Sequence, residues 1–421
     1  MMKKVLLAPL LSVCLLLTTN GTYFAADLNL QDNSYDVKVG GSLAFYLYDQ
    51  VHYTNNGGQF GMTDSNADTS INSFWLFLSK KISETVSVHV EPLVYGQTGA
   101  TPQPLTAFSA QEPTPNDGTV PGNNLGALQA SNPNLYNQVQ RQLDNYYNSP
   151  YIALGDNPYS QAAGVLTFKR ATLDLELPWE MELSLGRMAP LLTEEYGDNL
   201  FWNEDLTAST SILSFFSGFW EDTGAELYKN FEIGDVSLPV YAYVLNGTMF
   251  MQAIHRSKAV AVHLAPQYGN LKLMVSAYSG NWDIDDLHNQ TRYVAGFAYK
   301  LGKASVRAEY YTGTWDDVVF LQDMIIKNIT STGYYVKFFY NIAPRVTGIV
   351  RYDYLDNDFS GYYWPVTQVG ETYSTLSPTL KINVAESTDL MITYQMGDNK
   401  MKDGSLETIY DELYIGSRVT F

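Results

Sequence analysis

The charged residues of this chain recur at alternate positions within apolar segments, and this spacing indicates what chemistry they could perform. In segment 345–355 (RVTGIVRYDYL), Arg345, Arg351 and Asp353 share one parity, whereas Val350 and Tyr352 share the other. Side chains alternate between the two faces of a strand, so the charges of such a segment would line one face. A charged face of this kind can select ions and small solutes without making or breaking a bond.

The same parity argument predicts a larger set of side chains on the polar faces of several segments. The predicted pore-lining residues are Arg170, Arg292, Arg307, Glu309, Lys337, Arg345, Arg351 and Asp353. Asp174, Glu176 and Lys300 share this parity with them. For each of these residues, the alternative is a structural ion pair or a place at the rim of a sheet.

A second group of charges lies in one connecting segment, residues 189–222, which we predict to be a constriction loop. Its five acids fall between residues 191 and 205, and they are Glu194, Glu195, Asp198, Glu204 and Asp205. General porins fold their third long loop into the barrel, where its acids face arginines of the wall. The alternation in TASTSILSFF (207–216) leaves open a second interpretation, an additional hairpin.

Motifs for enzymatic catalysis are not found in the sequence. It contains neither a GxSxG nor an HExxH motif, and its five histidines are scattered without the spacing of metal ligands. The acidic stretches DIDD (283–286) and DND (356–358) do not have EF-hand spacing. We therefore expect no enzymatic activity, no cofactor and no metal site.

Sixteen segments have the alternation that would position these charges. They are 36–48, 69–79, 85–95, 165–177, 181–188, 223–231, 236–245, 258–265, 271–280, 291–301, 304–313, 332–340, 345–355, 372–384, 389–396 and the C-terminal segment 411–421. Most of them are longer than the usual globular strand of about 5–6 residues and match the roughly 9–11 that cross a bilayer at a tilt. Long and short connections follow each other in turn, with a very long interruption at 97–163.

This order of connections predicts an all-β fold, a transmembrane antiparallel β-barrel of 16 strands, or of 18 if the additional hairpin forms. Outer-membrane barrels have an even number of strands, short periplasmic turns and long extracellular loops. A soluble sandwich has no reason to sort its connections in this way. Both termini would lie on the periplasmic side, and the terminal Phe421 would serve as a signal for barrel assembly.

The N-terminal region predicts export. Lys3 and Lys4 precede an apolar run from Val5 to Leu17, which is typical of a secretory signal peptide covering residues 1–26. Cleavage is expected between residues 21 and 26, and residues 27–421 would form a single barrel domain. Removing the signal peptide also removes the one cysteine, Cys14, so the exported chain would contain no disulfide.

Charge and composition narrow the function classes. Without Lys3 and Lys4 the formal net charge changes from −19 to −21, which argues against a nucleic-acid partner. No apolar run after the signal peptide approaches the roughly 18 residues of a membrane helix. The chain has 32 Tyr, 19 Phe and 7 Trp, and aromatic girdles are a property of outer-membrane barrels.

Two segments carry a family resemblance. LSLGRMAPLLTEEYG (183–197) and EDTGAELYKNFEIG (221–234) resemble the Gly-Arg/Pro segment and the following strand of the phosphate- and polyphosphate-selective porins. The resemblance covers about a quarter of the chain, and it implies a barrel and diffusion across the outer membrane. The family's ladder of arginines and lysines has no matching run in this sequence, so its anion preference is not carried over. Trimeric assembly is what the resemblance implies.

The sequence therefore predicts a porin of a Gram-negative outer membrane that passes small hydrophilic solutes and ions, with a mild cation preference. Its expected partners are the lipid bilayer, lipopolysaccharide, the barrel-assembly machinery and two further copies of the chain. Two alternatives stay open. One is an anion-selective, phosphate-type porin. The other is a barrel plugged by residues 97–163 that acts as a scaffold or adhesin.

Overall fold

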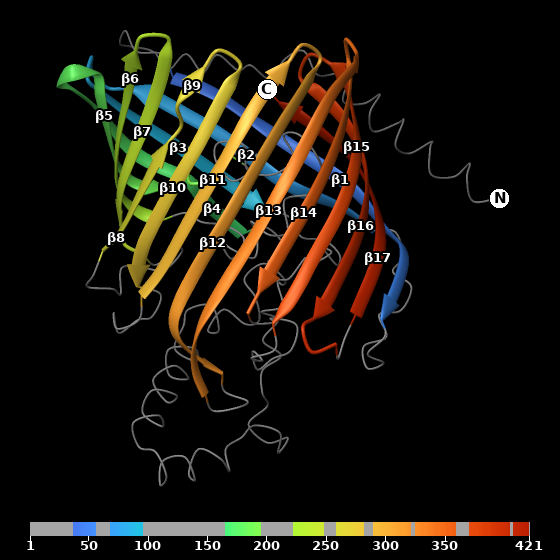
Figure 1. Ribbon diagram of the computed structural model, residues 1–421. Helices are drawn as coiled ribbons and strands as arrows, with labels where there is room; N and C mark the ends of the chain where they lie inside the picture. The colour runs from blue at the N-terminus through green and yellow to red at the C-terminus, as the bar shows by residue number, and fades with distance from the viewer. Residues whose placement is uncertain are drawn as a thin grey trace.

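The computed structural model describes residues 37–55, 68–95, 165–194, 222–247, 258–281, 289–320, 325–358, 370–404 and 407–420. Within these ranges the chain is almost entirely antiparallel β-sheet (Figure 1). Sixteen strands of at least six residues are present, together with one strand of two residues, β9. The predicted all-β class and the predicted number of strands are confirmed. The segments 97–163 and 207–216 lie outside the described residues.

The strand bounds agree with the predicted segments, apart from their ends. The first eight strands are β1 Val37–Asn55, β2 Asp68–Lys81, β3 Val86–Tyr95, β4 Val165–Leu177, β5 Met181–Met188, β6 Asp222–Ile233, β7 Val236–Leu245 and β8 Ala259–Leu264. After β9 Gln267–Tyr268 come β10 Leu271–Asn281, β11 Asn289–Leu301, β12 Ala304–Phe320, β13 Ile325–Ala343, β14 Val346–Asn357, β15 Glu371–Ala385, β16 Thr388–Met401 and β17 Glu407–Thr420.

The strands form a closed ring. Each strand pairs with the next one along the chain, and β9 continues β8, because both pair with β7 and β10. Strand β1 pairs with β2 on one side and with β17 on the other, so that Leu43 lies opposite both Phe74 and Val419. Figure 1 shows the resulting tilted barrel.

The two faces of the wall have the polarity that the sequence pattern predicts. On β14, Val350 and Tyr352 are exposed on the outside, whereas Arg351 and Asp353 are buried on the inside. The same alternation continues around the barrel, with apolar side chains outward and polar side chains inward. This arrangement suits a wall that contacts lipid on its outer surface. No helix in the described part of the chain is long and apolar enough to cross a membrane.

Short turns gather at one rim, which is at the top of Figure 1. They include the 3-10 turn η2 Pro178–Glu180 and the two-residue turns 234–235, 302–303, 344–345 and 386–387. Gly234 and Gly302 have φ values of 62° and 58°, a conformation that glycine adopts without a steric penalty. Strand β17 ends at this same rim.

Several strands are longer than predicted, and β12 and β13 differ most. The sequence indicates a loop at 314–331, but the ladder between these strands continues to Phe320 opposite Ile325. The hairpin extends past the neighbouring strands at the lower rim in Figure 1. Asp316 and Asp317 interrupt the apolar alternation there, and this interruption is what made the segment resemble a loop. A hairpin beyond the membrane needs no apolar face, so its ladder can continue through acids.

Candidate functional site

The segment that follows β5, residues 189–194, lies against the inner surface of the barrel, and we call it the inner segment. The Leu191 N–H donates to Tyr243 Oη on β7 at 3.1 Å. The Ser276 hydroxyl on β10 donates to the Leu192 carbonyl at 2.7 Å. Both wall residues are buried and point inward. The start of the predicted constriction loop 189–222 therefore lies within the barrel.

Glu194, at the end of the inner segment, reaches further around the wall. Its carboxylate forms an ion pair with Lys272 on β10. Its N–H donates to Glu309 Oε1 on β12 at 2.9 Å, and Glu309 Oε2 accepts a hydrogen bond from Tyr335 Oη on β13 at 2.7 Å. Charge-assisted contacts of this kind are stronger than neutral hydrogen bonds. The inner segment is thus fixed to β7, β10 and β12.

An apolar surface on the wall accommodates the inner segment. Leu192 packs into a cluster of buried side chains that face inward from β5, β7, β8 and β10–β13. The cluster consists of Met188, Leu192, Tyr243, Leu245, Ala259, Ala261, Tyr278, Val294, Tyr311 and Tyr335. Inward-facing apolar residues are unexpected in a water-filled bore, and covering them explains why the segment lies on this part of the wall.

Cross-strand register brings four cations into one row on the same side of the barrel. Arg307 on β12 lies opposite Lys337 on β13, and Lys337 lies opposite Arg351 on β14. On the other side of Arg307, Ala298 on β11 separates it from Lys272 on β10. We call Lys272, Arg307, Lys337 and Arg351 the basic row. With Arg292 on β11 they form the basic wall, the inner face of β10–β14.

Two carboxylates lie one row away from these cations. Glu309 and Asp353 are paired in register through Tyr335, which lies between them on β13. Arg351 Nε is 3.9 Å from Asp353 Oδ2, and both side chains are almost completely buried. The Lys337 ammonium is 5.8 Å from the centre of the Tyr335 ring. The basic wall therefore carries five cations against two wall carboxylates and Glu194.

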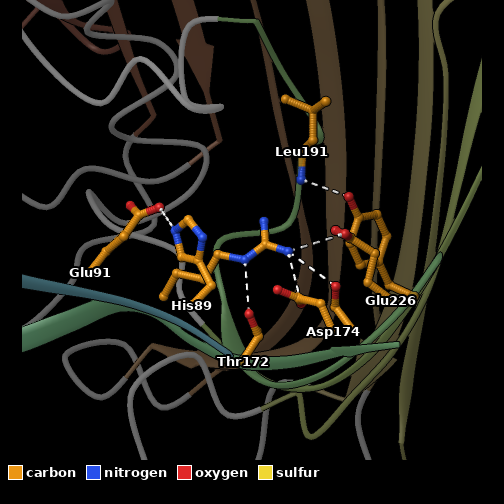
Figure 2. Close-up of polar contacts among 9 residues, drawn as sticks. His89, Glu91, Thr172, Asp174, Leu191 and Glu226 are labelled. Atoms are coloured by element: carbon orange, nitrogen blue, oxygen red, sulfur yellow. Dashed lines mark hydrogen bonds and ion pairs between the residues drawn. The ribbon is translucent and has the colours of Figure 1, made fainter. Parts of the chain in front are cut away.

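The inner face of β3–β6 has the opposite charge, and we call it the acidic wall. Its buried or partly buried inward carboxylates are Glu91, Asp174, Glu182, Asp222 and Glu226. Arg170 on β4 forms ion pairs with two of them, Asp174 and Glu226, which are labelled in Figure 2. Its Nη2 atom lies 3.6 Å from Asp174 Oδ1 and 3.8 Å from Glu226 Oε1.

Arg170 also donates hydrogen bonds to two hydroxyls of the acidic wall. Its Nε donates to Thr172 Oγ1 and a terminal nitrogen donates to Ser184 Oγ, each at 3.1 Å. A second pair lies on β3, where His89 Nε2 is 2.5 Å from Glu91 Oε1 (Figure 2). Arg170 thereby connects side chains from β4, β5 and β6. The described residues contain no group of three His, Cys, Asp or Glu side chains that could hold a metal ion.

The two charged walls lie on opposite sides of the barrel. Strands β7, β8 and β9 separate the two walls in one direction, and β15, β16, β17, β1 and β2 separate them in the other. The inner surface of the barrel therefore carries carboxylates on one side and cations on the other. Such an arrangement produces an electric field across the bore, and this field can orient dipolar solutes.

The predicted site residues can be placed individually. Arg170, Arg292, Arg307, Glu309, Lys337, Arg351 and Asp353 have the inward parity in the structure. Arg345 does not line the wall, because it lies in the exposed turn between β13 and β14 rather than on a strand. Glu194 lies in the inner segment, whereas Glu195, Asp198, Glu204, Asp205 and Phe421 are outside the described residues.

Sequence reasoning missed several residues of this site. Lys272 and Ser276 share the polar parity of β10, so the alternation of LKLMVSAYSG could have identified both. The basic row was missed for a different reason. Its members come from separate strands, and they become neighbours only through cross-strand register, which no run of consecutive residues shows.

Comparisons with known proteins show the fold. No protein-family model matches the chain, and no curated protein does. The outer-membrane channel DcaP of Acinetobacter baumannii matches with a TM-score of 0.57 at 10% identity, covering 93% of this chain and 99% of that one. The anion-selective porin from Comamonas acidovorans matches with a TM-score of 0.56 at 11% identity, covering 92% and 100%.

A trimer form of OmpT, an outer-membrane protein of Vibrio cholerae, matches with a TM-score of 0.53 at 11% identity, covering 92% of this chain and 100% of that one. Identities this low show a shared fold and no shared activity. The chain thus has the fold of outer-membrane porins. These matches do not show the narrower resemblance to phosphate- and polyphosphate-selective porins.

Proposed function

We propose that the chain is a non-enzymatic porin of a Gram-negative outer membrane, through which small hydrophilic solutes and ions diffuse passively. The observation that carries this proposal is the inner segment fixed across the inner wall between β7 and β12. A segment in this place narrows the bore without being part of the wall. The apolar outer face supports a position in a lipid bilayer, with lipopolysaccharide and the barrel-assembly machinery as partners.

We further propose that the basic row gives the channel an anion preference. Its four cations lie in one row on the inner face of β10–β14, Lys272 pairs with Glu194 of the inner segment, and the carboxylates nearest to the row are fewer. Charges at a narrow constriction act more strongly than solvated charges elsewhere on the chain. The negative net charge of the whole chain therefore does not determine the ion preference. The mild cation preference expected from the sequence depends on Glu204 and Asp205, which lie outside the described residues.

Conductance in planar bilayers tests the proposal directly. The purified, refolded chain should form ohmic channels, and a salt gradient should give a zero-current potential of the sign expected for anion preference. A zero-current potential of the opposite sign would contradict the anion preference and support the cation preference predicted from the sequence. A folded barrel without conductance would favour the alternative of a plugged scaffold or adhesin.

Deletion of residues 97–163 separates a plugging segment from a surface segment. Connections in compact proteins usually have about 4–6 residues, so an insertion of this length needs a reason. If the insertion contributes to the entrance, its deletion should raise the conductance. An unchanged conductance would assign the insertion to the outer surface. A homotrimer is the oligomer we propose, and light scattering of the detergent complex would measure it.

A further inference from the structure

His263 on β8 is connected to the inner segment through one intervening side chain. Its imidazole is fully buried and points inward. The Nδ1 atom lies 2.7 Å from Ser276 Oγ on β10, and that hydroxyl lies 2.7 Å from the Leu192 carbonyl. A chain of two hydrogen bonds therefore connects the wall to the backbone of the inner segment.

The number of available protons determines which atom donates in each of these two hydrogen bonds. A serine hydroxyl has one proton, and the carbonyl of Leu192 can only accept, so Ser276 donates to Leu192. Ser276 Oγ must then accept from His263, which places the imidazole proton on Nδ1. In this neutral tautomer Nε2 has a lone pair, and no described residue makes a hydrogen bond to it.

The groups that face His263 come from three elements. On β7, the Tyr241 ring lies 5.8 Å from the imidazole. On β10, Lys272 carries a positive charge that disfavours a second one, and in the inner segment Glu194 carries a negative charge that favours it. The next inward residue on β8 is the apolar Ala261. Lys272 and Glu194 carry opposite charges, so their effects on the protonation of His263 oppose each other, and the two groups also form an ion pair.

We propose that His263 and Ser276 are positioning residues that hold the inner segment on the wall at neutral pH, and that protonation of His263 displaces the segment. This inference rests on the proposed channel function and adds an acid response to it. A buried imidazolium would have an Nε2 proton without an acceptor among the described residues, and burying an unsatisfied charge is costly. Moving the inner segment away admits water to the ring, so proton uptake favours the displaced position.

Thiol labelling tests displacement even if the barrel does not conduct. Thr193 is fully buried in the inner segment, and Cys14 lies in the predicted signal peptide, so Thr193→Cys would introduce the only thiol of the exported chain. In liposomes the thiol should be protected at pH 8. Because the reactive thiolate fraction of any thiol falls with pH, the labelling rate is divided by that of an exposed reference thiol, and this ratio should rise as the pH falls. One proton per displacement limits this dependence to about tenfold per pH unit.

Two further variants separate the proposed chain of hydrogen bonds from general acid sensitivity. Asparagine places an amide N–H near the position of Nδ1 and does not titrate, so His263→Asn should keep the thiol protected at pH 5. Ser276→Ala should expose the thiol about tenfold more at pH 8, because it removes the hydrogen bond to Leu192. Ser331→Ala on β13, a buried serine away from the inner segment, is the matched control and should leave the labelling unchanged.

The proposal is overturned if the labelling of Thr193→Cys relative to the exposed reference thiol does not depend on pH, or if His263→Asn retains the full acid response. It is also overturned if Ser276→Ala behaves as Ser331→Ala does. If His263→Asn does not fold, His263→Gln replaces it as a variant that does not titrate, and only the dependence of its labelling on pH is then compared. Conductance of the same proteins keeps the two proposals apart. Acid-dependent labelling without any current would refute the proposed channel function and support the displacement of the inner segment. Current together with labelling that does not depend on pH would support the channel function and refute the displacement.

Discussion

The acidic wall and the basic wall differ in how far apart in the sequence their partners lie. Arg170, on the acidic wall, contacts Ser184 and Glu226, which are 14 and 56 residues away. On the basic wall, Glu194 contacts Lys272 and Glu309, which are 78 and 115 residues away. The acidic wall is therefore held by contacts within neighbouring strands, whereas the basic wall is completed by a segment that arrives from elsewhere. We infer that the first group of charges mainly stabilises the barrel and that the second mainly selects solutes.

The largest expected effect is the loss of stability when the acidic wall loses its cation. Arg170→Met would leave Asp174 and Glu226 close together without a positive charge between them. Breaking fully buried pairs costs about 3–5 kcal/mol, and since Arg170 is partly accessible we expect about 2 kcal/mol. The midpoint of urea unfolding in detergent measures this change. Arg170→Lys keeps the charge but loses the planar donor geometry, so its unfolding midpoint should lie between those of the wild type and Arg170→Met. Wild-type stability in Arg170→Met would contradict a structural role for this wall.

The next effect concerns ion preference and should appear only on the basic wall. Arg307→Met removes one cation of the basic row. A unit charge about 4 Å from an ion contributes roughly 1 kcal/mol in a water-like dielectric, which corresponds to about fivefold in the ratio of anion to cation permeability. The zero-current potential should move towards cations. Arg345→Met makes the same chemical change in the exposed turn 344–345, and equal shifts in both variants would mean that the basic row does not line the ion path.

A smaller effect is expected for the acid that the basic wall receives from the inner segment. Glu194→Gln removes the negative charge beside Lys272 but keeps the backbone N–H that donates to Glu309. The segment should stay in place and the wall should become more positive, so the zero-current potential should move towards anions by about twofold in permeability ratio. Glu386→Gln, in an exposed turn, serves as the control. A shift towards cations would show that Glu194 acts by holding the segment rather than by its charge.

The smallest effect is expected further along the same connection. Neutralising Glu204 and Asp205 together, as Glu204→Gln with Asp205→Asn, should also move the zero-current potential towards anions if these acids reach the bore. Screening weakens the effect of charges at a distance, so the shift should be larger at low salt than at high salt. If the potential stays constant at both salt concentrations, these acids lie outside the constriction.

Much of the barrel could be predicted from the sequence, because lipid outside and polar groups inside impose a period of two on every strand. That period determined the number of strands and the inward parity of residues such as Arg292 and Lys337. It failed where the lipid constraint ends. The β12–β13 ladder continues through Asp316 and Asp317, and Arg345 lies in a turn where parity has no meaning.

The arrangement of the site could be predicted less well than its residues. Parity places Arg307, Lys337 and Arg351 on the inner face, but only the pairing between strands makes them neighbours. The contacts of the inner segment with Tyr243 and Ser276 depend on a path across the bore. No local pattern encodes that path, since the apolar cluster that attracts the segment is assembled from seven strands.

The pairing of β1 with β17 has a consequence for how the chain folds. Leu43 and Val419 become neighbours only when almost the whole chain has been synthesised and ordered, so closure is a contact of very high sequence separation. The entropic cost of closing a loop grows only with the logarithm of its length. The large separation of β1 and β17 therefore slows closure of the barrel more than it lowers the stability of the closed barrel. Until β17 pairs, β1 presents an open strand edge that can pair with another chain. Truncation before β17 should therefore yield aggregates rather than a smaller barrel.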